Sequence, residues 1–84
     1  MIELRLYGGP HCRLCEEAKQ LIYPLLEPNK HKFVEVDITQ SLELKKRYGL
    51  KIPVLQRVDT EEELEWPFEQ QQVEKLLEPV SWSI

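Results

Sequence analysis

The spacing of apolar residues changes from alternate to helical near the N-terminus, and this change limits the possible folds more than any other feature. Residues 2–6 are apolar at every second position, which is the period of a strand with one buried face. After Gly-Gly-Pro at 8–10, apolar residues recur at helical spacing from Leu14 onward. The sequence therefore predicts a strand followed at once by a helix that begins near Cys12 or Arg13.

The expected helix carries one apolar stripe and a proline. The stripe consists of Leu14, Ala18, Leu21, Ile22, Leu25 and Leu26. Pro24 has no N–H to bond the Gln20 carbonyl, so the helix either kinks there or ends near Tyr23. Because the stripe continues beyond the proline, we expect a kink.

Three further strands and two further helices are expected. A second strand covers 33–38, and because a helix separates it from the first, the pair is expected to be parallel. A short helix follows, with Thr39 as its N-cap and Gly49 as a left-handed residue at its end. Residues 54–58 and 63–66 are typical of an antiparallel hairpin, and a last helix completes the order β-α-β-α-β-β-α.

Length and charge exclude several classes of protein. Eighty-four residues suffice for one domain, which we place at 1–78, with a C-terminal tail at 79–84. Fifteen acidic against eleven basic side chains give a net charge of -4, and no basic patch is interleaved with aromatic residues, so we expect no nucleic-acid partner. No run of about 18 apolar residues is present, so we expect no membrane insertion.

The chain has two cysteines, Cys12 and Cys15, and both stand where the helix is expected to begin. Unpaired N–H groups at a helix N-terminus favour the thiolate form, so a pair placed there can attack a disulfide and then close on itself. Met1 leads directly into the first strand without the features of an export signal, so we expect a cytoplasmic protein. In that compartment a Cys-x-x-Cys pair is more often redox-active or metal-binding than structural.

With Cys-x-x-Cys after the first strand and Ile-Pro at the head of the third, the chain resembles the glutaredoxin branch of the thioredoxin-like fold, most closely small bacterial glutaredoxin-like proteins. The segments that carry the resemblance are Leu6-Tyr7, residues 12–18, residues 48–55 and Trp66-Pro67-Phe68. The resemblance covers residues 1 to about 78. It implies an α/β fold of the glutaredoxin type, with a four-stranded mixed sheet flanked by helices.

The resemblance also implies a thiol–disulfide oxidoreductase with Cys12 as nucleophile and Cys15 as resolving thiol. The physical argument agrees, because Cys12 has the helix terminus and Arg13 beside it, whereas Cys15 falls inside the helix. Leu6 stands six residues before Cys12, where thioredoxins place a buried aspartate, so we expect no carboxylate to move protons from the resolving thiol. The alternatives are a thioredoxin-like protein-binding or redox-sensing module without turnover, and a pair of inert thiols.

Substrate contacts are expected next to the dithiol. The family holds the proline that corresponds to Pro53 in the cis form, and the residue before it, here Ile52, offers its backbone to an extended substrate. His11 and Arg13 are further candidate substrate contacts, and His11 is also a candidate to tune Cys12. We expect a monomer whose partner is a disulfide-containing protein or a small thiol.

No resident metal or cofactor is expected. A closed zinc site needs four ligands, and the good candidates are Cys12, Cys15, His11 and His31, of which His11 and Cys12 are adjacent in the chain. A bridging iron–sulfur cluster, as some glutaredoxins hold, would need an external thiol, and nothing in the sequence specifies it.

Glutathione is expected to be a weak co-substrate. Glutaredoxins carry a Gly-Gly turn and an acidic residue at the start of the last helix, where backbone amides hold the γ-glutamyl carboxylate. This chain has Trp66-Pro67-Phe68-Glu69 at the corresponding place. Because proline has no N–H to donate and the aromatic rings fill space that glycines leave open, we expect weak binding of the tripeptide.

Overall fold

The structure is a computed structural model that describes residues 1–79, so residues 80–84 of the expected tail lie outside the described part. The strands are β1 (Ile2–Gly8), β2 (His31–Asp37), β3 (Val54–Arg57) and β4 (Glu63–Glu65). The helices are α1 (Arg13–Ile22), α2 (Leu42–Tyr48) and α3 (Gln70–Leu76), with short 3-10 helices η1 (Tyr23–Leu25) and η2 (Ile38–Gln40). The predicted order of strands and α-helices is confirmed.

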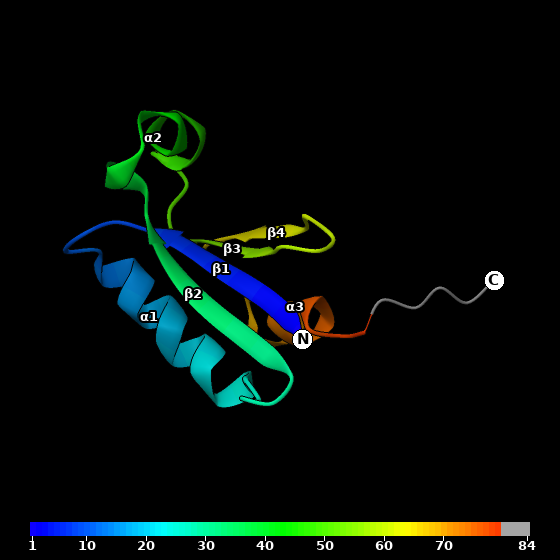
Figure 1. Cartoon of the computed structure of the whole chain (residues 1–84). Coiled ribbons are helices and arrows are strands. Elements are labelled where there is room, and N and C mark those ends of the chain that lie inside the picture. The colour runs from blue at the N-terminus through cyan, green and yellow to red at the C-terminus, as the bar shows by residue number, and fades with distance from the viewer. Residues whose placement is uncertain (80–84) are drawn as a thin grey trace.

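The four strands form one mixed sheet in the order β2-β1-β3-β4 (Figure 1). β1 and β2 run parallel, whereas β3 is antiparallel to both β1 and β4. Gly8 at the end of β1 pairs with Asp37 at the end of β2, and Tyr7 pairs with Val54 at the start of β3. The chain therefore enters α1, η2 and β3 at the same end of the sheet, and this end carries the two cysteines.

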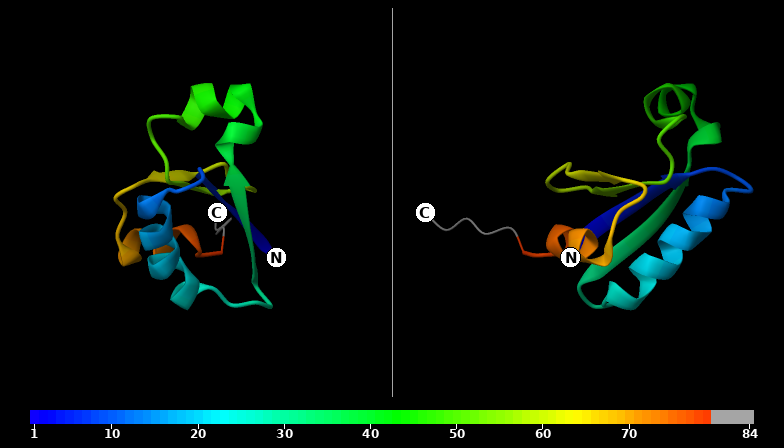
Figure 2. Two further views of the ribbon diagram at one scale, coloured as in Figure 1. Left: turned by 90° about the vertical axis from the view of Figure 1, so that its left-hand side faces the viewer. Right: turned by 180° about the vertical axis from the view of Figure 1, so that it is seen from behind.

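Helices cover both faces of the sheet (Figures 1 and 2). Helices α1 and α3 pack on one face, and their side chains form the larger core with apolar residues of β1 and β3. The members of that core that are buried are Leu4, Leu6, Ala18, Ile22, Leu55, Phe68, Val73 and Leu76. The mixed α/β architecture expected from the resemblance is confirmed. No helix within residues 1–79 has both the length and the apolar character needed to cross a membrane.

Helix α2 covers the opposite face with a smaller core built from two tyrosines. The rings of Tyr7 and Tyr48 stack with their centroids 4.4 Å apart, and Ile38 and Val54 complete the cluster. The Tyr48 hydroxyl donates a hydrogen bond of 2.5 Å to the Glu63 carboxylate. This bond joins α2 to β4 across the sheet.

Helix α1 differs from the sequence expectation at two points. The α-helix ends at Ile22 and the chain continues as the 3-10 helix η1, in which Pro24 occupies one of the first two positions. The expected kink is therefore wrong, and the alternative of an end near Tyr23 is what the structure shows. The missing proline N–H is tolerated because Pro24 lies at the start of a new helical segment. Leu14 is 46% exposed and does not belong to the core.

Both predicted ends of α2 need correction. Ser41, not Thr39, is the N-cap, since its hydroxyl accepts the Leu44 N–H at 3.3 Å. Thr39 lies in η2, where its hydroxyl and N–H both donate to Asp37. Gly49 is not left-handed, because its φ is -52°. A Cβ there would instead press against the Lys45 carbonyl oxygen, so the residue is small for steric reasons.

One buried arginine anchors α3 to the sheet. Arg57 is 3% exposed, and its guanidinium donates to the Leu76 carbonyl at 2.9 Å and to the Glu78 carbonyl. The same group bonds the Asp59 carboxylate at 2.7 and 3.2 Å. The carbonyls left unpaired at the end of a helix are thereby satisfied, and the buried charge is neutralised.

Candidate active site

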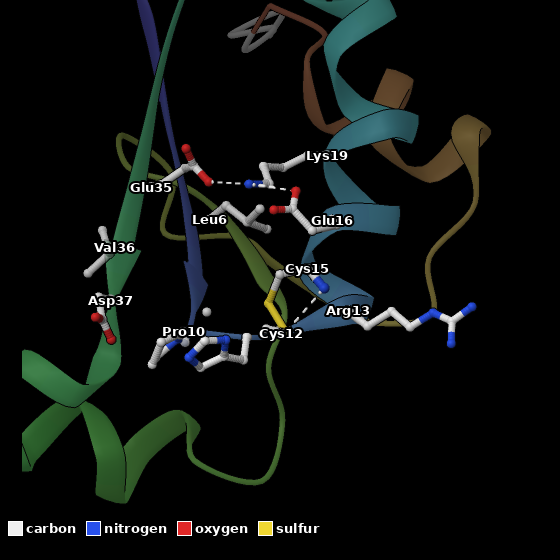
Figure 3. Close-up of a pocket in the computed structure, with 13 residues that line it drawn as sticks. Leu6, Pro10, Cys12, Arg13, Cys15, Glu16, Lys19, Glu35, Val36 and Asp37 are labelled. Atoms are coloured by element: carbon white, nitrogen blue, oxygen red, sulfur yellow. Dashed lines mark hydrogen bonds and ion pairs between the residues drawn. A yellow bond between two sulfur atoms is a disulfide. The ribbon is translucent and has the colours of Figure 1, made fainter.

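The two cysteines lie at the N-terminus of α1 and are joined by a disulfide with sulfur atoms 2.18 Å apart (Figure 3). Cys12 is the N-cap of the helix, and its sulfur accepts the Cys15 N–H at 3.1 Å. Cys15 is only 7% exposed, whereas Cys12 is partly open to solvent. In the reduced protein, the N–H that points at the Cys12 sulfur would stabilise a thiolate there.

The space for the Cys15 sulfur is created by a glycine at the end of β1. A Cβ built on Gly8 would lie 2.6 Å from Cys15 Sγ, far inside ordinary van der Waals contact. Alternate residues of a strand point to the same face, so Gly8 faces α1 together with Leu4 and Leu6. The absence of a side chain at this one strand position lets the helix bring its buried sulfur onto the sheet.

The loop between β1 and α1 holds one residue in an unusual conformation. His11, which directly precedes Cys12, has a φ of 58° although it carries a side chain, and its side chain is exposed. Such left-handed residues cost of order 1–2 kcal/mol and are frequent next to functional groups. The Arg13 side chain extends away from the disulfide (Figure 3), so the structure gives it no contact with the Cys12 sulfur.

A hollow of about 590 Å³ lies between α1 and β2, beside the disulfide. An ion-paired lysine lines it: Lys19 bonds Glu16 and Glu35, each at 2.8 Å (Figure 3). The hydrogen bonds that Lys19 donates to Glu16 and then to Glu35 raise the pKa of Lys19 above its usual value. This cluster ties α1 to β2 close to the cysteines and holds Lys19 in its charged form.

The carboxylates near the hollow are not buried acids. The side chains of Glu16 and Glu35 are 67% and 55% exposed, and both are paired with Lys19. Asp37 also lines the hollow, and hydrogen bonds from Thr39 lower its pKa. In the place where thioredoxins carry a buried aspartate, Leu6 is 2% exposed and apolar.

The Ile52–Pro53 loop lies against the dithiol loop. The Ile52–Pro53 peptide bond is cis, and Pro53 is buried. A Cβ built on Gly9 would lie 3.6 Å from the Ile52 side chain, which places the two loops in contact. The Ile52 N–H donates to the Tyr48 carbonyl at 3.2 Å, so an extended substrate would have to compete for this donor.

Two aromatic side chains of the segment before α3 pack against each other. Trp66 and Phe68 meet edge to face with ring centroids 5.0 Å apart, and Phe68 is buried. The Trp66–Pro67 bond is cis, and the Trp66 N–H donates to the Pro53 carbonyl at 3.1 Å. The Glu69 N–H is used by the Gln72 side chain at 2.7 Å.

The metal-ligand candidates from the sequence do not converge. Within residues 1–79, no group of three or more His, Cys, Asp or Glu side chains is placed to hold a metal ion. His31 begins β2 at the end of the sheet away from the cysteines, and its Nδ1 accepts the Glu27 N–H at 2.9 Å.

Two features of this site were not expected from the sequence. No contact of Gly8 with Cys15 was expected, although the position of Gly8 in the alternation of β1 places it on the helix-facing side. The Lys19 cluster was missed because Glu35 belongs to another element, and only the strand order brings it to α1. Glu16 and Lys19 are three residues apart on the helix and could have been predicted as a pair.

Comparison with known proteins agrees with this geometry. A glutaredoxin-like domain family (DUF836) matches residues 3–78. The X-ray structure of the structural genomics target protein XcR50 from X. campestris is 31% identical, covers 88% of this chain and 93% of its own, and has a TM-score of 0.74. Its solution structure is 31% identical, with 92% of each chain covered and a TM-score of 0.73.

A more distant structure supports the fold alone. A point mutant of thioredoxin from Halobacterium salinarum NRC-1 is 19% identical and covers 95% of this chain and 78% of its own, with a TM-score of 0.67. No curated protein matches the chain. The family match over nearly the whole described chain, with the cysteine pair at disulfide distance, shows that the protein belongs to the glutaredoxin-like domain family and has the thioredoxin-like fold.

Proposed function

We propose that the protein is a thiol–disulfide oxidoreductase with Cys12 as the attacking thiol and Cys15 as the resolving thiol. One observation carries the proposal: the Cys12 sulfur is the N-cap of α1 and accepts the Cys15 N–H at 3.1 Å, while Cys15 is buried beside it. The two thiols are therefore unequal in exposure and in electrostatic support. A thiolate, not a thiol, is the nucleophile in disulfide exchange.

In the first step, the Cys12 thiolate attacks one sulfur of a substrate disulfide. A bond forms between Cys12 and that sulfur, the substrate disulfide breaks, and its other half leaves as a thiolate. In the second step, Cys15 loses its proton and attacks the Cys12 sulfur, which expels the remaining substrate thiolate. The substrate gains two electrons, and the protein is left with the Cys12–Cys15 disulfide seen in the structure.

A new cycle needs a reductant. We propose an external thiol or dithiol that reopens the Cys12–Cys15 bond by the reverse of these steps. Solvent or the departing substrate thiolate takes the proton of Cys15, since Leu6 carries no carboxylate to act as a base. Glu16 and Glu35 are paired with Lys19, and Asp37 accepts hydrogen bonds from Thr39. We also propose that the protein acts as a monomer in the cytoplasm without a resident cofactor.

Glutathione is proposed to be a poor reductant for this protein. Pro67 has no N–H, Phe68 is buried, and the Glu69 N–H is already bonded to Gln72. Each missing charge-assisted hydrogen bond weakens binding by about 1.5–3 kcal/mol, so the loss of two reduces affinity by roughly two to four orders of magnitude. A coupled assay with glutathione and its reductase should run far below the rate reached with a dithiol reductant.

The experiment that tests the function is turnover of a small neutral disulfide, such as hydroxyethyl disulfide, with a dithiol as reductant. Cys12→Ser should abolish turnover, whereas Cys15→Ser should accumulate a mixed disulfide on Cys12 that mass spectrometry detects. Full activity of Cys12→Ser would contradict the assignment. Stoichiometric oxidation without turnover would favour the alternative of a redox-sensing or protein-binding module.

A further inference from the structure

The segment that leads into the Ile52–Pro53 loop is rich in basic residues, although the protein as a whole is acidic. Residues 45–51 contain four of the eleven Lys and Arg residues and no Asp or Glu, although the whole chain has a net charge of -4. We call these residues the basic segment. Its charged residues, Lys45, Lys46, Arg47 and Lys51, are all exposed.

Most of this charge has no partner within the protein. Lys45 and Lys46 make no ion pair among residues 1–79, and Arg47 lies 5.4 Å above the ring centre of Tyr48. Lys51 pairs with Glu65 at 3.4 Å, but both side chains are more than half exposed, so solvent weakens this pair. The segment therefore leaves several positive charges free to attract a partner.

An apolar side chain stands among these charges. Leu50 is 104% exposed, the highest value among the large apolar side chains of residues 1–79. Interfaces commonly place an apolar contact inside a rim of charged groups. A favourable interaction of basic side chains with the C-terminal dipole of α2 would explain Lys45, Lys46 and Arg47, but not Leu50 and Lys51, which follow the helix.

The basic segment lies at the end of the sheet that carries the dithiol. It runs directly into Ile52, whose side chain contacts the loop that holds Cys12. Lys45 is close enough to Asp37 for its charge to add to the lowering of the Asp37 pKa, which the Thr39 hydrogen bonds dominate. Asp37 lines the same hollow as Cys12. In Figure 1, α2 and the loop before α1 project from the same end of the sheet.

From this arrangement we infer that the basic segment is a docking surface for an acidic protein segment that carries the disulfide attacked by Cys12. This inference rests on the proposed oxidoreductase function and names its class of substrate. The acidic remainder of the molecule repels such a partner, whereas the basic segment attracts it, so encounters are oriented with the dithiol toward the partner. Leu50 adds an apolar contact once the partner is bound.

A polypeptide fits this surface better than a nucleic acid. Single-stranded nucleic acids bind where aromatic rings are free to stack with bases. The one aromatic residue of the basic segment, Tyr48, is 2% exposed and already stacked on Tyr7. The exposed side chain between the charges is instead aliphatic.

The test compares three disulfide-linked peptides that differ only in having acidic, neutral or basic residues beside the cysteine. Pre-reduced protein is mixed with each peptide and thiol release is followed at low and high salt. We expect the acidic peptide to react at least about tenfold faster than the basic one at low salt, with the ratio shrinking as salt is added. Equal rates for the three peptides would overturn the inference.

Charge-reversal variants test whether the basic segment is the surface that attracts the acidic peptide. Lys45→Glu combined with Lys46→Glu should remove most of the preference for the acidic peptide. Lys30→Glu combined with Lys32→Glu makes the same change in net charge on exposed residues at the far end of β2 and should leave the preference in place. Equal loss of preference in both double variants would mean that only net charge matters, which would overturn the docking surface.

Two further measurements separate docking from chemistry. All variants should reduce the small neutral disulfide at the wild-type rate. A wild-type protein that does not reduce this disulfide at all would contradict the oxidoreductase function itself. Binding of a fluorescent acidic peptide without cysteine, measured by anisotropy, tests docking without any disulfide exchange. Tighter binding of the basic peptide, or of a single-stranded oligonucleotide of equal charge, would overturn the inference.

Discussion

Replacement of Gly8 by alanine tests how the fold holds the resolving sulfur. The added Cβ would lie 2.6 Å from Cys15 Sγ, whereas ordinary van der Waals contact begins at 3.4 Å, so the two atoms must separate by nearly an ångström. In the oxidised protein this sulfur is bonded to Cys12, so it cannot rotate away. Ala18, one turn later in α1, is fully buried, so the helix cannot easily shift away from the sheet either. We expect the oxidised protein to lose about 2–3 kcal/mol of unfolding free energy, the upper part of the range for overpacked cores.

The same substitution should lower the unfolding free energy of the reduced protein by a smaller amount. Without the bond to Cys12, the Cys15 side chain can rotate away from the new methyl group, so we expect a loss of about 1–2 kcal/mol. A difference of about 1 kcal/mol between the two forms corresponds to a roughly fivefold shift of the thiol–disulfide equilibrium toward the dithiol. The substitution therefore affects the redox balance as well as the stability.

Urea denaturation of the oxidised and reduced forms measures both effects, and Gly9→Ala is the matched control. A Cβ on Gly9 would meet only the Ile52 side chain at 3.6 Å, an ordinary contact. Both substitutions stiffen the unfolded chain alike, which stabilises by about 0.4–1 kcal/mol, so Gly9→Ala should be neutral or stabilising. Equal stability of Gly8→Ala and Gly9→Ala in the oxidised form would mean that the Cys15 sulfur does not restrict the side chain at position 8.

Three other substitutions test the scaffold. Arg57→Met should lower the unfolding free energy by about 2–4 kcal/mol, since it leaves helix carbonyls unpaired. Urea denaturation measures this loss, and an unchanged stability would mean that the contacts of Arg57 are unimportant. Burial and then the bond to Glu63 raise the pKa of Tyr48 above its usual value of about 10, so the unfolded chain ionises first and stability should fall as pH rises above about 10. Tyr48→Phe should reduce that alkaline loss; an identical pH profile would contradict the shift. His11→Gly should raise the melting temperature, through a gain of about 0.5–1 kcal/mol, because glycine adopts the left-handed backbone without strain. Glu61→Gly is the control, since Glu61 also has a positive φ, 62°, but lies in the turn between β3 and β4.

The sequence predicts the order of elements well because local patterns determine it. Alternation in β1, helical spacing in α1 and the resemblance of the cysteine and proline segments each point to the same fold, which the structure confirms. The errors lie at element ends. Thr39 and Ser41 are both good N-caps, and only the short turn η2 decides between them.

The site was predicted less completely than the fold because much of it depends on contacts between distant residues. Cys12 and Cys15 are recognisable by their spacing, and their disulfide distance agrees with that interpretation. The contact of Gly8 with Cys15 and the bridge from Lys19 to Glu35 need the register of β1 against β2 and the placement of α1 over it. Spacing along the chain carries no such information.

Residue-resolved alkylation tests whether Cys12 of the reduced protein is an activated thiolate while Cys15 is not. The reduced protein is exposed briefly to iodoacetamide across a range of pH, and mass spectrometry then gives the extent of modification at each cysteine. We predict that Cys12 reacts first, with an apparent pKa well below the value of about 8.5 for a free thiol, while Cys15 reacts slowly until the protein unfolds. Faster alkylation of Cys15, or a pKa of Cys12 at or above that of a free thiol, would contradict the assignment of Cys12 as the attacking thiol.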